Sequence, residues 1–150
     1  MLLRFLYPFA KIYWRLFPSV SLGTRVFAIR DGKVLLVRMT YLENWYFPGG
    51  GVDRHESLKD GASRELFEET GWRAGSLKFV ALYFDNREKA SNHVALFFCD
   101  ELELVVGASP DREIADVGWF AFDSLPAGVS PATRRRIDEY LAGASPAERW

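Results

Sequence analysis

The chain has 150 residues, a formal net charge of −1 and 49% hydrophobic residues. That length suits one domain with a full core, and the composition is that of a globular protein rather than a disordered one. The balanced charge provides no broad basic field, so we expect no specific nucleic-acid binding. The single cysteine, Cys99, excludes an intrachain disulfide and a cysteine-based zinc cluster, and it is typical of the reducing cytoplasm, where we expect the protein.

Residues 1–20 contain an amphipathic segment, which we separate from a single domain over residues 21–150. Apolar side chains in this segment follow helical spacing, and basic side chains lie on the other side. The apolar residues are Leu2, Phe5, Leu6, Phe9, Ile12, Tyr13, Leu16 and Phe17, and the basic ones are Arg4, Lys11 and Arg15. The segment is too short and too charged to span a membrane. Membrane-surface contact through residues 1–18 stays open, but we favour packing against the segment's own domain or in a homodimer.

The rest of the chain predicts more strands than helices, in an order that is not a regular βαβ repeat. Two apolar, β-branched runs flank Asp31-Gly32 and predict a β-hairpin. The predicted strands cover residues 24–30, 33–39, 76–86, 92–106 and 115–122. This pattern indicates an α+β protein built on a mixed sheet.

Two helices are predicted, one after the glycine-rich stretch at Gly49-Gly50-Gly51 and one over residues 131–141. On the second helix, the basic run at residues 134–136 is most simply a solvent-exposed face. On the first, Ser57 offers its hydroxyl to the orphan amides of the first turn, and Gly71 lies where a left-handed residue would end the helix.

Three carboxylates lie on one face of the first helix. Glu65 precedes Glu68 by three residues and Glu69 by four, so their side chains project together, beside a stripe of apolar residues. Like charges at this spacing destabilise an exposed helix by about 0.2–0.5 kcal/mol per pair. A cluster that costs stability suggests that a cation fills its centre, and carboxylate oxygens suit Mg²⁺ or Mn²⁺. Arg64 can pair with Glu68 across one turn and fix its orientation.

The spacing of these residues resembles the signature of the Nudix hydrolases. Gly50, Glu56, Arg64-Glu65-Leu66, Glu68-Glu69 and Gly71 fit that frame completely, and residues 45–49 resemble its lead-in. Three positions depart from the family's usual residues. Trp72 replaces an aliphatic residue, His55 replaces a glycine, and Asp53 replaces a glutamate. None of the departures removes a core acid.

The resemblance implies the Nudix fold, a curved mixed sheet between helices, and a pyrophosphohydrolase that acts on a nucleotide or another small diphosphate. It implies Mg²⁺ or Mn²⁺ held by Glu65, Glu69, Glu68 and Glu56, with the Gly50 carbonyl. By the same analogy, Glu65 is the candidate base that takes a proton from the attacking water, with Arg64 orienting it and Glu68 assisting. Glu113, just before a predicted strand, is a further candidate for an acidic ligand or base, although an exposed loop acid is the simpler interpretation.

The sequence does not identify the substrate. Family subgroups that act on ADP-ribose or dinucleoside polyphosphates carry a marker residue downstream of the signature. The corresponding positions here are residues 86–90, and neither marker residue is present there. Tyr46 could stack on a base, and Arg87 and His93 could contact phosphates. Core packing or solvated charge is the simpler interpretation of all three.

Three other hypotheses compete with a hydrolase. A Nudix-fold sensor that binds a nucleotide without turnover would not need to keep Arg64-Glu65 and Glu68-Glu69. A membrane-surface protein would act mainly through residues 1–18. An isopentenyl diphosphate isomerase would need a catalytic cysteine and further metal-binding histidines, and this chain has only Cys99, His55 and His93.

Overall fold

A computed structural model describes residues 20–85 and 91–150. Residues 1–19, and with them the amphipathic segment, lie outside the described residues, as does the candidate Arg87. Within the described part, no helix is long and apolar enough to cross a membrane.

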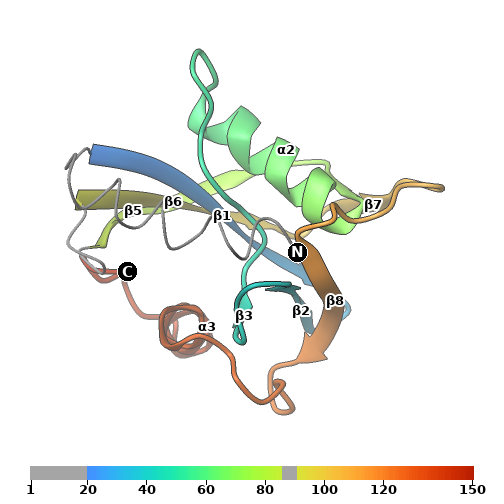
Figure 1. Cartoon of the computed structure of the whole chain (residues 1–150). Coiled ribbons are helices and arrows are strands. Elements are labelled where there is room, and N and C mark those ends of the chain that lie inside the picture. Colours follow the sequence, from blue (N-terminus) through green and yellow to red (C-terminus); the bar gives the residue numbers. More distant parts are fainter. Residues whose placement is uncertain (1–19, 86–90) are drawn as a thin grey trace.

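A mixed, curved sheet forms the centre of the molecule, with one helix on each side (Figure 1). Its strands run in the order β3-β2-β1-β6-β5, with β8 paired to β2, and β4 and β7 form a separate two-stranded sheet. The elements are β1 (Val20–Arg30), β2 (Lys33–Met39), β3 (Trp45–Tyr46), α2 (Leu58–Thr70), β4 (Trp72–Ala74), β5 (Lys78–Asp85), β6 (Ser91–Cys99), β7 (Leu102–Leu104), β8 (Ile114–Ala121) and α3 (Pro131–Ala142). The predicted α+β class, the hairpin and both helices are confirmed.

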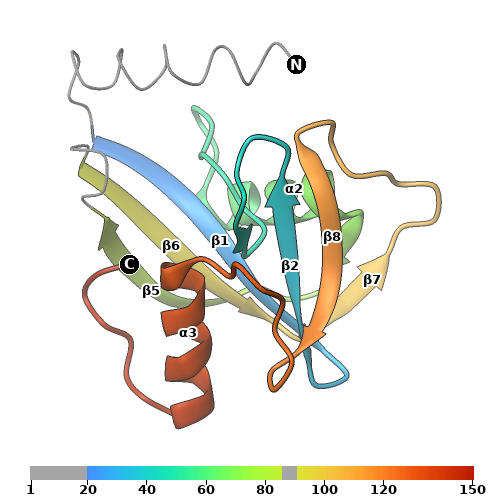
Figure 2. The ribbon, with the colours of Figure 1, turned by 60° about the horizontal axis from the view of Figure 1, so that its bottom comes forward.

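Strand β1 pairs with three different partners along its length. It runs parallel to β6, and only its last residues pair with β2, where Ile29 lies opposite Val34. Its first half instead pairs with the glycine loop: the Thr24 N–H donates to the Gly50 carbonyl at 2.8 Å. The divergence of β2 from β1 therefore opens a place for the glycine loop within the sheet (Figure 2).

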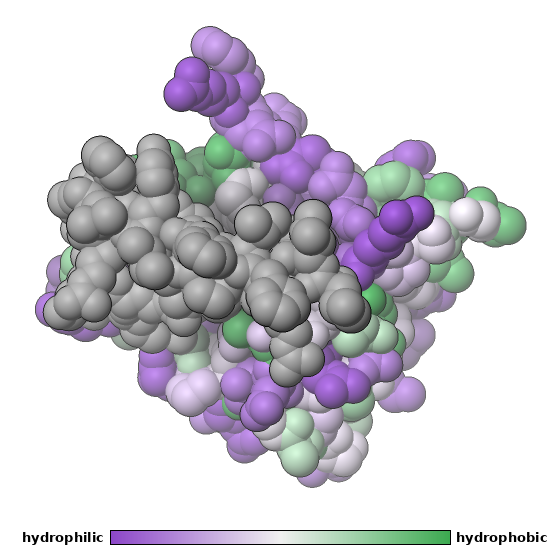
Figure 3. Space-filling model, in the orientation of Figure 1, coloured by the Kyte–Doolittle hydropathy of each residue, from purple (hydrophilic) through white to green (hydrophobic). Residues whose placement is uncertain are grey.

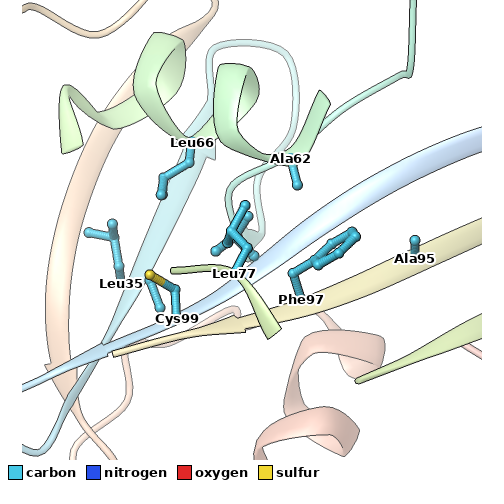
Figure 4. Close-up of a cluster of buried hydrophobic side chains, with 9 residues drawn as sticks. Leu35, Ala62, Leu66, Leu77, Ala95, Phe97 and Cys99 are labelled. Atoms are coloured by element: carbon cyan, nitrogen blue, oxygen red, sulfur yellow. The ribbon is translucent and has the colours of Figure 1, made fainter. Parts of the chain in front are cut away.

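Alternation along β1 separates two hydrophobic cores. Val26 and Ala28 point to the α2 side, whereas Phe27 points to the α3 side. The α2-side cluster also contains Leu66 and Cys99, and the cysteine is fully buried (Figure 4). These buried contacts fix the position of α2, and with it the position of the three acids, relative to the sheet.

The predictions missed two local features. The predicted strand over residues 92–106 is broken, because β6 ends at Cys99 and β7 pairs with the unpredicted strand β4. The exposed basic face predicted at residues 134–136 is also wrong in part, since Arg136 is only 2% exposed. Its guanidinium pairs with Glu139 and lies 4.4 Å from the Tyr83 ring centroid. These side chains take the place of the water that an exposed guanidinium would contact.

Candidate active site

Helix α2 begins and ends where its sequence predicts. Ser57 is the N-cap and its side chain accepts the Asp60 N–H at 3.1 Å, while Gly71 ends the helix with a φ of 74°. A glycine adopts this left-handed conformation without the steric cost that a Cβ brings. Leu66 is fully buried against the sheet, which aims the adjoining Glu65 and Glu69 at the glycine loop.

Arg64 connects three carboxylates of the site. Its Nε and Nη2 donate to the two oxygens of Glu56 at 2.8 and 2.9 Å, and its Nη1 donates to Glu65 and Glu68 at 2.9 and 3.1 Å. The fork-shaped pair with Glu56 lowers the pKa of that carboxyl from 4.5 to about 2. A second contribution comes from the Asp53 N–H, which donates to Glu56 at 2.9 Å. Arg64 therefore fixes the orientation of these carboxylates.

One residue of the loop before α2 and one residue of α2 explain how Glu56 reaches Arg64. His55 adopts a φ of 67°, the left-handed region that a glycine enters without strain, so the residue usual in the family suits this backbone better. On α2, a Cβ added to Gly61 would lie 3.0 Å from Glu56 Oε2. The glycine within the helix therefore leaves room for the Glu56 carboxylate.

Glu69 is the most buried acid of the site. Its Oε2 accepts the Gly49 N–H at 2.7 Å, and its side chain is almost enclosed between α2 and the loop. Burial raises its pKa from 4.5 to about 7, against the opposing effects of Arg25 and of the Gly49 N–H. Gly49 itself has a φ of 141°, and a Cβ there would lie 2.1 Å from the Thr24 carbonyl oxygen. Only glycine fits between β1 and this carboxylate.

Glu65 lies directly against Gly50. A Cβ on Gly50 would come within 2.7 Å of Glu65 Oε1, so the absent side chain makes room for the carboxylate. Burial raises the pKa of Glu65, while Arg64 opposes the shift. The carboxylate is thus partly desolvated and hydrogen-bonded at the same time, a combination common among functional acids.

An acidic pocket of about 170 Å³ joins the helix to the segment before β8. Its lining residues are Glu65, Glu68, Glu69, Asp111, Glu113 and Ile114. The Asp111 N–H donates to the Glu68 carbonyl at 2.8 Å, which fixes this segment against the end of α2. Glu113, also near the Tyr41 hydroxyl at 3.3 Å, lies in the same pocket as the helix acids. The three helix acids face a single space, as their spacing predicts.

The donor set of this pocket suits a hard divalent cation. Carboxylates are the ligands that Mg²⁺ and Mn²⁺ prefer, and Mg²⁺ commonly uses one or two of them together with water and substrate oxygens. In the described residues, no three acidic, histidine or cysteine side chains are already arranged around one point as a metal cage. Arg64 already donates hydrogen bonds to Glu56, Glu65 and Glu68. The chain fits a cation shared with a substrate better than a closed structural metal site.

Two of the other predicted site residues, Tyr46 and His93, lie outside the acidic pocket. Tyr46 is half-buried in β3, with the Arg25 guanidinium 6.0 Å from its ring centroid, and it does not line the acidic pocket. His93, on β6, lies 5.6 Å from the ring of Phe84, and it does not line the pocket either. The Gly50 carbonyl accepts the Thr24 N–H, which leaves one lone pair for another partner.

One contributor was not predicted from the sequence. Arg25, on β1, donates from Nη1 to the Gly49 carbonyl and, at 3.2 Å, to the Phe47 carbonyl. Its charge also lowers the pKa of Glu65 and Glu69. An arginine among β-branched residues at the start of a strand was the only signal, and it does not indicate a contact with a loop more than twenty residues later.

A model of the NUDIX domain matches residues 21–141 of this chain. The chain belongs to the Nudix hydrolase family. This Nudix hydrolase is 31% identical over 123 residues to a Bacillus subtilis (strain 168) protein named "Putative 8-oxo-dGTP diphosphatase", with 81% of this chain and 80% of that protein covered. It is 28% identical to an RNA pyrophosphohydrolase of Rhizobium meliloti (strain 1021), over 67% of this chain and 72% of that protein.

Solved structures agree with the fold. A MutT NUDIX hydrolase from Burkholderia pseudomallei superposes with a TM-score of 0.68 at 25% identity, covering 80% of this chain and 97% of that one. A NUDIX hydrolase from Nitrosomonas europaea gives a TM-score of 0.73 at 21% identity, covering 88% and 93%. The predicted family and fold are confirmed, and the Nudix hydrolase described here is a pyrophosphohydrolase.

Proposed function

We propose that this Nudix hydrolase uses Mg²⁺ or Mn²⁺ to cleave a diphosphate linkage in a nucleoside diphosphate derivative or a nucleoside triphosphate. The observation that carries the proposal is the acidic pocket, in which the α2 acids face Asp111 and Glu113 across one space. A cluster of carboxylates would repel a diphosphate unless a cation lay between them. The pocket therefore calls for a cation and an anionic substrate together.

Glu65, Glu68 and Glu69 would hold the cation, with Glu56 and the Gly50 carbonyl as further candidates. When bound, a divalent cation neutralises diphosphate oxygens and lowers the pKa of a bound water. Glu65 is the candidate base, because Arg64 Nη1 orients its carboxylate at 2.9 Å and burial raises its pKa toward the range in which a carboxylate takes a proton. Arg64 positions Glu65 and Glu56 as one unit.

The first test is a phosphate- and pyrophosphate-release assay with Mg²⁺ and then Mn²⁺. Its panel contains nucleoside triphosphates, 8-oxo-dGTP, 5′-triphosphorylated RNA, ADP-ribose, NADH, dinucleoside polyphosphates and sugar nucleotides, since two relatives bear names from this range. One substrate far ahead of the others, with no release in EDTA, supports the proposal. Equal release with and without the cation refutes the metal requirement.

The matched variants are Glu69→Gln and Glu103→Gln. Glu103 is an exposed acid on β7 that does not line the pocket, so its variant should keep full activity. Glu69→Gln should lose turnover on the order of 10²-fold or more, the typical effect of removing an electrostatic catalytic group. If the protein released no product from the whole panel while still binding a nucleotide, the activity proposal would give way to a sensor without turnover.

A further inference from the structure

The side of the sheet that carries α2 is only partly covered. Helix α2 packs mainly on β1 and β4, and in Figure 1 the far ends of β1, β6 and β5 extend beyond it. Large hydrophobic residues are exposed on this side of the sheet: Val20 is 70% and Leu22 48% exposed at the start of β1, and Phe79 is 58% and Leu82 47% exposed along the edge strand β5. We call these four residues the open apolar face. Hydrophobic surface is visible in Figure 3 beside the projecting hydrophilic loop that leads into α2.

Strand register places the four residues on one side of the sheet. Phe79 pairs with Phe97 and Leu82 with Ala95, and both partners belong to the core cluster beneath α2. Val20 and Leu22 lie an even number of residues before Val26 of the same cluster, so their side chains point the same way. The open apolar face is therefore a continuation of the α2-side core, without a cover among the described residues.

The dimensions of this face suit one helix. Neighbouring strands lie about 4.8 Å apart, so β6 and β5 extend about 10 Å beyond β1. An α-helix with its side chains is about 10–12 Å across, and packed helices lie about 8–10 Å apart. A second helix beside α2 would thus fill the layer to the edge of the sheet at β5.

We propose that the amphipathic segment of this chain, residues 1–18, docks on the open apolar face. The segment carries an apolar stripe that needs a cover, and it joins the described structure at Val20, which is itself part of the face. Pro18 and Ser19, which separate the two in the sequence, are residue types that favour turns. A tethered segment has a high effective concentration at the face, whereas a second molecule loses translational and rotational freedom on binding.

Charge supports the same orientation. With the apolar stripe docked on the sheet, the outer side of the segment would carry Arg4, Lys11 and Arg15, whose charged groups would stay hydrated. The same stripe could bind a membrane surface or a second copy of the chain, but either would leave the open apolar face without a cover within its own molecule. The proposal does not depend on the substrate or on the metal.

Disulfide trapping in the full chain tests the docking. Cys99 is fully buried and burial raises its pKa, so it is a poor competitor for engineered cysteines. Leu82→Cys is combined in turn with cysteines at the stripe positions Leu6, Phe9 and Ile12, and in a matched control with Lys11→Cys. A second control pairs each stripe cysteine with Tyr140→Cys, because Tyr140 is exposed on α3 at the opposite side of the sheet.

Oxidation at low protein concentration should give an intrachain disulfide between at least one stripe cysteine and the Leu82→Cys thiol. That bond should form several-fold faster than in the Lys11→Cys and Tyr140→Cys controls. Equal rates in all pairs would overturn the proposal, as would products that are mainly crosslinked dimers, which would indicate a second copy as the occupant. Absence of the intrachain bond together with co-sedimentation on anionic vesicles would point to a membrane surface instead. If Leu82→Cys does not fold, Phe79→Cys takes its place.

Discussion

Replacing Glu69 by glutamine should lower activity and raise stability at the same time. Glu69 is 7% exposed, and burial raises its pKa from 4.5 to about 7. The folded protein therefore holds a proton that the unfolded chain releases between these two values, so stability falls as the pH rises from about 4.5 to about 7. At about 1.4 kcal/mol per pH unit, ionisation of Glu69 costs the fold at most about 3 kcal/mol above pH 7.

Urea unfolding in EDTA, at about pH 5 and about pH 8, measures this effect without a bound cation. Glutamine keeps an oxygen that can accept the Gly49 N–H, so we expect Glu69→Gln to be more stable than the parent at the higher pH, by about 1–3 kcal/mol. The gain should nearly vanish at the lower pH, where the parent's carboxyl is protonated. Glu103→Gln should show neither effect. A gain of the same size at both pH values would refute the argument, because it would not come from ionisation.

Three further predictions concern Gly50, Glu113 and Arg136. Gly50→Ala should lower kcat on the order of 10²-fold, because the added Cβ would lie 2.7 Å from the Glu65 carboxylate and displace it. Gly51→Ala is the control, because a Cβ at that position has no atom of the described residues within 4 Å. Equal rates for the two variants would contradict the steric argument. Glu113→Gln should lower kcat/KM about 10- to 100-fold. Asp116→Asn is the control and should leave kcat/KM unchanged, because Asp116 pairs with Arg38 outside the pocket. An unchanged kcat/KM in Glu113→Gln would exclude Glu113 from the site. Arg136→Met should lower the free energy of unfolding in urea by about 3–5 kcal/mol, because it leaves Glu139 without its partner. The exposed Arg134→Met should lower it by about 0.5 kcal/mol or less. Similar losses in the two variants would show that burial of Arg136 is not the cause.

Local signals predicted the site better than they predicted the sheet. Ser57 and Gly71 define α2 through hydrogen bonds and a backbone conformation that depend on residues within one turn. The positions of Glu65, Glu68 and Glu69 on one face follow from helical periodicity alone. Each of these features needs no information from distant parts of the chain, and each is present in the structure.

The features that the sequence did not reveal depend on contacts between distant segments. Arg136 is buried because Tyr83 from β5 and Trp150 from the end of the chain surround its guanidinium, 4.4 and 5.7 Å from the ring centroids. Nothing within the basic run distinguishes it from Arg134, which is exposed and pairs with Asp138. The contact of Arg25 with the glycine loop arises in the same way, since it depends on the separation of β2 from β1.

The arrangement of basic groups explains how so many carboxylates fold into one place. Arg64 binds Glu56, Glu65 and Glu68 together. Among the described residues, Glu69 has only the Gly49 N–H within hydrogen-bonding distance, together with the more remote charge of Arg25. The two groups therefore respond in opposite ways: the pKa of Glu56 falls to about 2, and that of Glu69 rises to about 7. A cation in the pocket would be most valuable to the acid with the least compensation, because charge in a desolvated place interacts most strongly. Under the proposed function, Glu69 would therefore be the residue at which the stability of the fold and the affinity for a cation are most directly coupled.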